Sequence, residues 1–215
     1  MFEDDADKER ITVTPLKSFL LCTLSLVIFT TACQSATSSP LTIDMKSEEE
    51  QRQIVDDFTF DDYKALFDDV ITEANKFDVE EPLRKWVIRT LSQEKLYYET
   101  DLTDEQVITL STEAMKHDIA WKMVAKEQYN IHVTEEEIDR YIQQGPDRSD
   151  LPSHLAYASA LGLSLQQLNH QFDRDLYEKN TIWLKLKLEL EKKYQTDDNN
   201  ELVDRYEAEV NAQLD

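Results

Sequence analysis

The chain has 215 residues, of which 40% are hydrophobic, so it can build a core and is not a wholly disordered protein. Gly145 and Gly162 are its only glycines, which argues against sheet-rich and phosphate-loop enzymes and favours a mainly helical chain. Acidic residues outnumber basic residues by 45 to 23, a balance that opposes nucleic-acid binding. We therefore expect an acidic helical protein with no nucleic-acid partner.

The N-terminal region resembles a bacterial lipoprotein signal. Lys17 precedes an apolar run from Phe19 to Phe29, which is shorter than the roughly 20 residues that span a bilayer and has the length of a signal-peptide core. The sequence TTAC follows and resembles a lipobox, although a threonine stands where leucine is usual. We predict that residues 1–32 are a cleaved signal peptide and that Cys33 carries the lipid. An ordinary signal peptide with an incidental cysteine, or an uncleaved anchor, is the alternative.

A short polar stretch separates this signal from the rest of the chain. Residues 34–46 are mostly small and polar, so we predict a flexible tether over 33–46. The remaining residues, 47–215, are expected to form one all-α domain, an irregular bundle of about six to eight helices.

Helix starts are marked by capping boxes, in which a Ser or Thr is followed three residues later by Glu or Gln. These boxes are Ser47 with Glu50, Thr103 with Gln106, Thr134 with Glu137, and Ser164 with Gln167. Apolar residues at helical spacing predict helices over 60–77, 81–98, 103–129, from Thr134, over 151–161, from Ser164 to about Lys193, and over 201–214. Asn130 and Gly162 are expected to end helices, and Gly145 begins a loop.

The segment 183–190, WLKLKLEL, is ambiguous because its alternation of apolar and polar residues is a strand signal. Its Leu, Lys and Glu residues are good helix formers, and it contains no β-branched residue. We predict a helix that is apolar on more than one side and therefore central in the bundle.

No catalytic or metal site is evident in the sequence. The four histidines are His117, His132, His154 and His170. Glu113 and His117 have the i, i+4 spacing of a metal-ligand pair, but such pairs arise by chance in so acidic a chain. The neighbouring acids Asp56-Asp57, Asp61-Asp62 and Asp68-Asp69 are interpreted as solvated helix faces. Cys22 would leave with the signal peptide. We expect no enzyme activity, cofactor or metal.

Two segments, AWKMVAKEQYNIHVTEEEIDRYI (120–142) and LGLSLQQLNHQFDRDLYEKNTIWLKLKLELEKKY (161–194), resemble the N-terminal helical domain of SurA/PrsA-type extracytoplasmic foldases. The shared features are a capped helix of the form TxEEID after a valine, and a Leu-Gly-Leu-Ser turn before a long helix. This resemblance covers about 80 residues and implies a helical chaperone domain that cradles unfolded or extended segments. The parvulin isomerase domain of that family is missing, because only about 20 residues follow 194.

The expected function is that of a chaperone-like protein, lipid-anchored on the extracytoplasmic face of the cell membrane, that binds polypeptide clients without isomerising proline. The alternative is a structural or adaptor lipoprotein with one dedicated envelope protein as its partner. An enzyme with an unrecognised site is the third and weakest interpretation.

Overall fold

A computed structural model describes residues 42–214 of the chain. The predicted signal peptide and its lipidated residue Cys33 lie outside the described residues. Residues from Thr42 onward form a compact unit through their own contacts.

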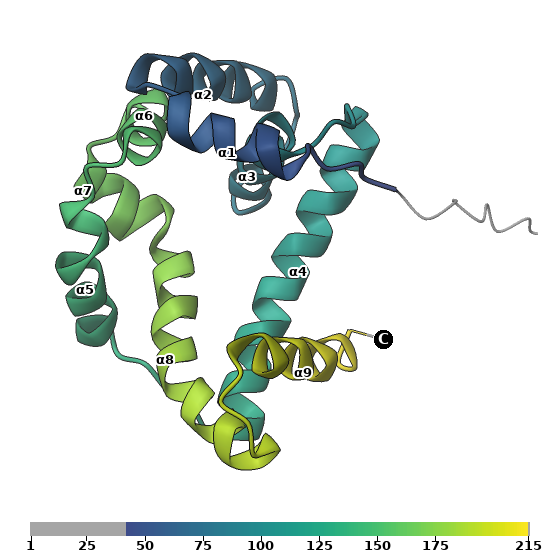
Figure 1. Ribbon diagram of the computed structural model, residues 1–215, viewed down its shortest axis with the longest axis vertical. Helices are drawn as coiled ribbons and strands as arrows, with labels where there is room; N and C mark the ends of the chain where they lie inside the picture. The colour runs from purple at the N-terminus through teal and green to yellow at the C-terminus, as the bar shows by residue number, and fades with distance from the viewer. Residues whose placement is uncertain (1–41, 215) are drawn as a thin grey trace, which may run out of the picture. The chain divides into compact units, whose positions relative to one another are not determined.

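Within residues 42–214 the regular structure is helical, which confirms the predicted all-α fold (Figure 1). The α-helices are α1 (Glu48–Asp57), α2 (Phe60–Ala74), α3 (Leu83–Tyr97), α4 (Asp104–Tyr129), α5 (Glu135–Gln144), α6 (Pro152–Ala160), α7 (Leu165–Gln167), α8 (Arg174–Tyr194) and α9 (Asn199–Asn211). A 3₁₀ turn, Pro146–Arg148, follows α5, and a π-helical turn, Leu168–Phe172, follows α7. The described residues thus hold nine α-helices, one more than the largest number expected.

Local capping chemistry explains why most helix boundaries could be predicted. All four predicted capping boxes are present, with each Ser or Thr oxygen accepting a hydrogen bond from a backbone N–H of the first turn. A further box, Thr59 with Asp62, begins α2 and was not anticipated. Asn130 ends α4 in the left-handed region at φ 53°, and Gly162 follows α6 at φ 69°. Each of these signals acts within one turn, so it is readable without tertiary structure.

The prediction of a single helix from Ser164 to about Lys193 is wrong, because the helix is interrupted at Asp173. The backbone N–H of Asp173 donates to the Leu168 carbonyl at 2.8 Å, closing the π-helical turn. The Asp173 carboxylate accepts a hydrogen bond from Arg89 of α3 at 2.9 Å. Arg89, 84 positions away, stabilises this interruption of the helix. Helical periodicity in the sequence does not indicate such a distant partner.

The helices pack in neighbouring groups that Figure 1 makes visible. α2 lies beside α6 and α3, and α3 in turn lies along α4. α5 packs on α8, while α9 crosses both α4 and α8 near the end where these two long helices approach each other.

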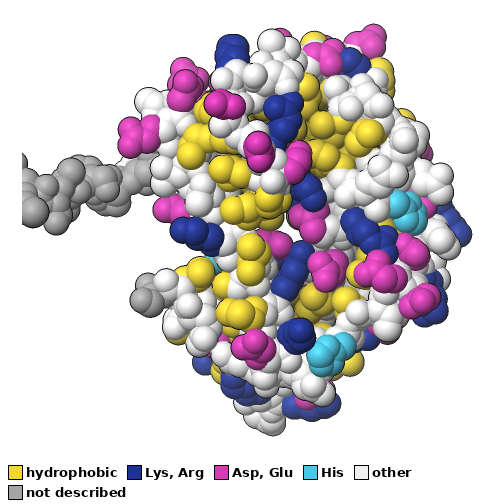
Figure 2. Space-filling view, turned by 180° about the vertical axis from the view of Figure 1, so that it is seen from behind, with side chains coloured by type: hydrophobic (Ala, Val, Ile, Leu, Met, Phe, Trp, Pro, Cys, Tyr) yellow, Lys and Arg dark blue, Asp and Glu magenta, His cyan; other side chains and the backbone are white. Residues whose placement is uncertain are grey.

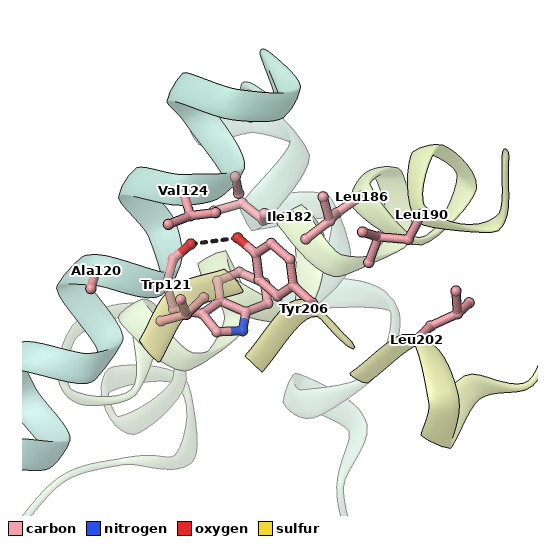
Figure 3. Packing of buried hydrophobic residues seen from close by; sticks show 10 residues of the cluster. Ala120, Trp121, Val124, Ile182, Leu186, Leu190, Leu202 and Tyr206 are labelled. Carbon is pink, nitrogen blue, oxygen red and sulfur yellow. Dashed lines mark hydrogen bonds between the residues drawn. The ribbon is translucent and has the colours of Figure 1, made fainter. Parts of the chain in front are cut away.

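Where α4, α8 and α9 meet, they share a hydrophobic cluster (Figure 3). Its buried members are Ala120, Trp121, Val124, Ala125, Ile182, Leu186, Leu190, Leu202, Tyr206 and Val210. The hydroxyl of Tyr206 donates to the Trp121 carbonyl at 2.7 Å, so the polar atom of this buried ring has a partner.

The ambiguous segment 183–190 is helical, as predicted, and belongs to α8. Its central position is only half right. Leu186 and Leu190 are fully buried, whereas Leu184 and Leu188 are 60% and 55% exposed. The alternating leucines therefore fall on two faces of α8, and only one of these faces has a neighbouring helix to cover it.

The last residues of the predicted 33–46 tether are held against the folded unit. Lys46 N–H donates to the Tyr97 carbonyl, and Glu99 N–H donates to the Asp44 carbonyl, both at 2.8 Å. These are antiparallel backbone contacts with the connection between α3 and α4. Residues 44–46, which the predicted tether included, therefore have backbone partners in the folded unit.

Candidate functional site

A cavity of about 430 Å³ lies between α3, α6 and the start of α8 and opens to the surface. Its volume is within the range of ligand-binding clefts, roughly 300–1,000 Å³. The lining residues are Phe67, Trp86, Arg89, Thr90, Ser92, Gln93, Leu96, Tyr97, Ala114, Ser153, His154, Tyr157, Asp173 and Leu176. Half of these fourteen side chains are apolar or aromatic and half are polar or charged, so the cavity can take an apolar group beside polar ones.

α3 supplies one wall of the cavity because its two faces have different partners. Trp86, Arg89, Gln93 and Tyr97 follow one another at steps of three or four and line the cavity. Side chains on another face, such as Leu91, are fully buried against α2 and α4. The core-facing residues fix the position of α3, and this position presents the other face to the cavity.

Aromatic packing forms the wall contributed by α6. The ring of Tyr157 lies with its centroid 4.8 Å from that of Phe67 and 5.9 Å from that of Phe172. Burial raises the pKa of Tyr157, so its hydroxyl stays protonated and acts as a neutral polar group. The Tyr157 part of this wall is therefore uncharged at neutral pH.

A buried network of charges lies at the base of the cavity. The Arg89 guanidinium donates to Asp173 at 2.9 Å and to the two oxygens of Asp175 at 2.7 and 2.8 Å. Lys85 adds a contact to Asp175 at 3.2 Å. The guanidinium also lies over the ring of Trp86, 4.9 Å from its centroid. Two cations and two carboxylates thus form a network that is neutral as a whole.

Burial and ion pairing shift the pKa values of these groups in opposite directions. Burial favours the neutral form of Asp175, but the hydrogen bonds and charges of Arg89 and Lys85 outweigh it and lower its pKa to about 2. Burial dominates for Asp173 and raises its pKa. Burial alone would lower the pKa of Arg89, yet Asp175 and Asp173 raise it. The network is therefore held together by a permanently charged arginine.

One polar atom of this network is left without a partner. Arg89 Nε is buried and makes no hydrogen bond to any of the described residues. An unsatisfied buried donor lowers the stability of the folded protein by about 1–3 kcal/mol. The region around the cavity is therefore less stable than a fully satisfied network would make it.

A second cavity, of about 450 Å³, adjoins the first. Both are lined by Thr90, Gln93 and Ala114, and the second continues along α4 to Asn211 and Leu214 at the end of α9. Together they give a hollow long enough for more than one side chain of a bound segment.

The histidines considered in the sequence do not come together. His154 lines the first cavity, while His170 contacts Asp147 at 2.9 Å. His117 pairs with Glu207 of α9 at 2.7 Å, and not with Glu113. Among residues 42–214, no group of three or more His, Cys, Asp and Glu has a metal-binding arrangement. His132 is exposed, and all six residues of the neighbouring acid pairs are exposed as well.

Apolar side chains also reach the outer surface (Figure 2). That view shows hydrophobic patches separated by acidic and basic side chains. The most exposed large apolar residues include Ile119 and Met123 on α4, and Leu184 and Leu188 on α8, each at least 42% exposed. Acidic and apolar side chains are thus interspersed on the exterior.

The charged network was not predicted from the sequence, although the sequence contains two signs of it. Arg89 stands inside the apolar run WVIRTL of α3, and two aspartates flank Arg174 in the predicted long helix. A charge within an apolar helix face indicates a buried partner, but the sequence does not say which acid that partner is.

No family model, curated protein or solved structure matches the chain. In the described part of the chain, no helix combines the length and the apolar character needed to cross a membrane.

Proposed function

We propose that this protein is a chaperone-like protein, anchored by a lipid at Cys33 on the extracytoplasmic face of the cell membrane, that binds unfolded or extended polypeptide segments. It binds them without prolyl isomerase activity. The observation that carries this proposal is the cavity of about 430 Å³, with its apolar and aromatic walls. Unfolded chains expose apolar side chains, and a cavity that covers such side chains slows aggregation without chemistry.

The two segments that resemble the foldase family support this proposal. The Leu-Gly-Leu-Ser turn has Gly162 at positive φ and a capping box at Ser164. The TEEEID segment begins α5 with a capping box at Thr134. These two turns match the local structures that the resemblance implies, but the helix that follows Ser164 has only three residues in place of the implied long helix. Two cavity residues, Asp173 and Leu176, lie within the second segment.

The charge of the protein suits a binder of exposed apolar segments. A net charge of −22 keeps copies of the chain apart, which limits self-association through its own apolar patches. The same charge favours clients that carry basic residues next to their apolar ones. Two acyl chains would supply on the order of 20 kcal/mol of membrane affinity, far more than nearby acidic residues oppose.

Binding is tested by filling the cavity. Ser153 lines it from α6, so Ser153→Trp should occupy the space that a client side chain needs. Ser159 is exposed on the same helix and does not line the cavity, so Ser159→Trp is the matched control. The purified protein and the control should slow light scattering by a denatured test protein at near-stoichiometric ratio, whereas Ser153→Trp should not. Equal protection by both variants would contradict cavity binding.

Two further measurements separate the proposal from its alternatives. The protein should leave the rate of a proline-limited refolding phase unchanged, and acceleration of that phase would contradict the non-catalytic part. If it neither protects nor accelerates, the adaptor function with one dedicated envelope partner becomes the better explanation. Anchoring is tested by incorporation of labelled fatty acid, which Cys33→Ser should abolish.

A further inference from the structure

A third, smaller pocket, of about 230 Å³, lies where α4, α8 and α9 meet. Trp121, Trp183 and Tyr206 form its aromatic wall, with ring centroids 5.0–6.5 Å apart. Lys179 and Asn180 of α8 provide polar groups beside these rings. The volume is below the roughly 300 Å³ of clefts for drug-sized ligands, so it suits a single end group.

Lys179 differs from the other charged groups around this pocket. Its Nζ lies 4.7 Å from the centroid of the Trp121 ring. Among residues 42–214, no carboxylate oxygen lies within the 4.0 Å of an ion pair with it. Exposed lysines often lack a partner, but Lys179 is partly buried against an aromatic ring.

The acids near Lys179 already have partners of their own. Lys122 contacts Asp118 at 2.9 Å and Glu178 at 3.0 Å. Glu207 contacts His117 at 2.7 Å. The pocket therefore contains one cation whose direct contact with an anion is unfilled, next to aromatic walls that can hold an apolar group.

We propose that this pocket binds a carboxylate attached to an apolar or aromatic group, with Lys179 contacting the carboxylate and the rings of Trp121 and Trp183 packing on the apolar part. Two sources share this chemistry, the C-terminal residue of a polypeptide and a free small aromatic acid. Asn180 is placed to donate a second hydrogen bond from its amide.

The ionisation of Lys179 agrees with this geometry. Burial lowers its pKa, and the charges of Asp118 and Glu207 offset this effect only in part. A carboxylate in direct contact would supply the missing favourable interaction. Glu207 opposes an incoming anion, but its carboxylate is engaged by His117. The net charge of the chain adds little, because charges beyond roughly 8 Å are screened at physiological salt.

The test uses the three tryptophan indole N–H signals of the ¹⁵N-labelled full chain. Trp121 and Trp183 report on this pocket, and Trp86 reports on the cavity of the proposed function. The probes are N-acetyl-phenylalanine and its amide, and a Gly-Ser peptide ending in phenylalanine, with a free or an amidated C-terminus. Each acid should shift the Trp121 and Trp183 signals and bind at least about tenfold tighter than its amide.

Variants on α8 separate contact from general charge. Lys179→Gln should weaken binding of the acids at least about tenfold, and Lys179→Arg should restore most of it. Lys187→Gln removes the same charge from the same helix outside the pocket and should change little. Circular dichroism melting shows whether each variant is folded. Tighter binding of the peptide acid assigns the site to chain ends, and binding of the amino acid alone assigns it to small acids.

Three results would overturn the proposal. They are equal binding of acids and amides, equal loss in Lys179→Gln and Lys187→Gln, and the absence of any shift in the Trp121 and Trp183 signals. Because Trp86 reports separately, none of these results bears on the client-binding cavity.

Discussion

The two ends of the described unit are stabilised in different ways. Where α4, α8 and α9 meet, side chains such as Leu186 and Tyr206 are fully buried, and the hydroxyl of Tyr206 is satisfied. Where α3, α6 and α8 meet, a cavity of about 430 Å³ lies beside buried Arg89 and Asp173. The first end is held mainly by apolar contacts, with ion pairs such as Lys193–Glu209 at 2.8 Å beside them. The second end is held in part by charges that are largely removed from water.

This difference means that the two ends should respond to different kinds of substitution. A dry apolar cluster gains from every contact it makes, whereas a buried ion network roughly balances desolvation against attraction. Replacing all members of such a network together changes the stability little, whereas removing one member leaves an unpaired charge and lowers the stability strongly. The end with the cavity of about 430 Å³ should therefore respond most to single charge changes, and the end where α4, α8 and α9 meet should respond most to single changes of side-chain volume.

The largest effect is expected from Arg89→Met. Removing this cation leaves the buried Asp173 and the partly exposed Asp175 with only Lys85 nearby. Breaking a fully buried pair costs about 3–5 kcal/mol, which is the upper value for this change. Urea unfolding at pH 7 measures the loss. The triple variant that also carries Asp173→Asn and Asp175→Asn should regain part of it. A single variant as stable as the parent protein would show that the network does not hold the cavity end together.

A comparable but smaller loss of stability is expected from Leu186→Ala, at the end where α4, α8 and α9 meet. Its side chain is fully buried, and such truncations cost about 2–5 kcal/mol. Leu188→Ala makes the same chemical change two residues along the same helix, where the side chain is 55% exposed, and should change stability by about 0.5 kcal/mol or less. Thermal and urea unfolding compare the pair. Similar losses at both positions would mean that α8 is covered on both faces.

The smallest expected effect is a difference between the two ends in how a substitution's effect on stability depends on pH. The folded-state pKa of Asp175, about 2, is below its unfolded value of about 3.9, so its contribution is present above pH 4 and lost as the pH falls from about 4 to 2. Asp175→Asn should cost roughly 1–2 kcal/mol at pH 7 and should flatten the loss of stability between pH 4 and 2.

Urea titrations at several pH values measure this difference, with Leu186→Ala as the control. That variant changes no ionisable group, so its loss should be the same at pH 7 and at pH 3. An Asp175→Asn variant with the acid dependence of the parent protein would place the titrating group elsewhere.

Most of the fold could be predicted because its signals are local. Thr103 with Gln106 predicts where α4 begins, and Asn130 predicts where it ends, within one helical turn of each residue. Apolar residues at helical spacing predicted the helix over 60–77, and two of them, Phe67 and Val70, are buried. Residue types, caps and spacing contain this information without any partner helix.

What could not be predicted depends on which element covers which face. Leu186 and Leu188 are the same residue in the same segment, yet only one of them has a helix opposite it. The break at Asp173 depends on Arg89, which is distant in sequence. The cavity is lined by parts of five helices, α2, α3, α4, α6 and α8, together with Asp173, so no single stretch of sequence contains its pattern.

The antiparallel contact of residues 44–46 with the end of α3 determines where a mechanical force would enter the protein. A pull on the chain ahead of Thr42 reaches the folded unit first at the backbone bonds of Asp44 and Lys46. Beyond them the tension passes to Tyr97, the last residue of α3 and a lining residue of the cavity of about 430 Å³. These backbone hydrogen bonds carry the force before it reaches the α4–α8–α9 cluster. Tension on the N-terminal side therefore acts first on the rim of that cavity.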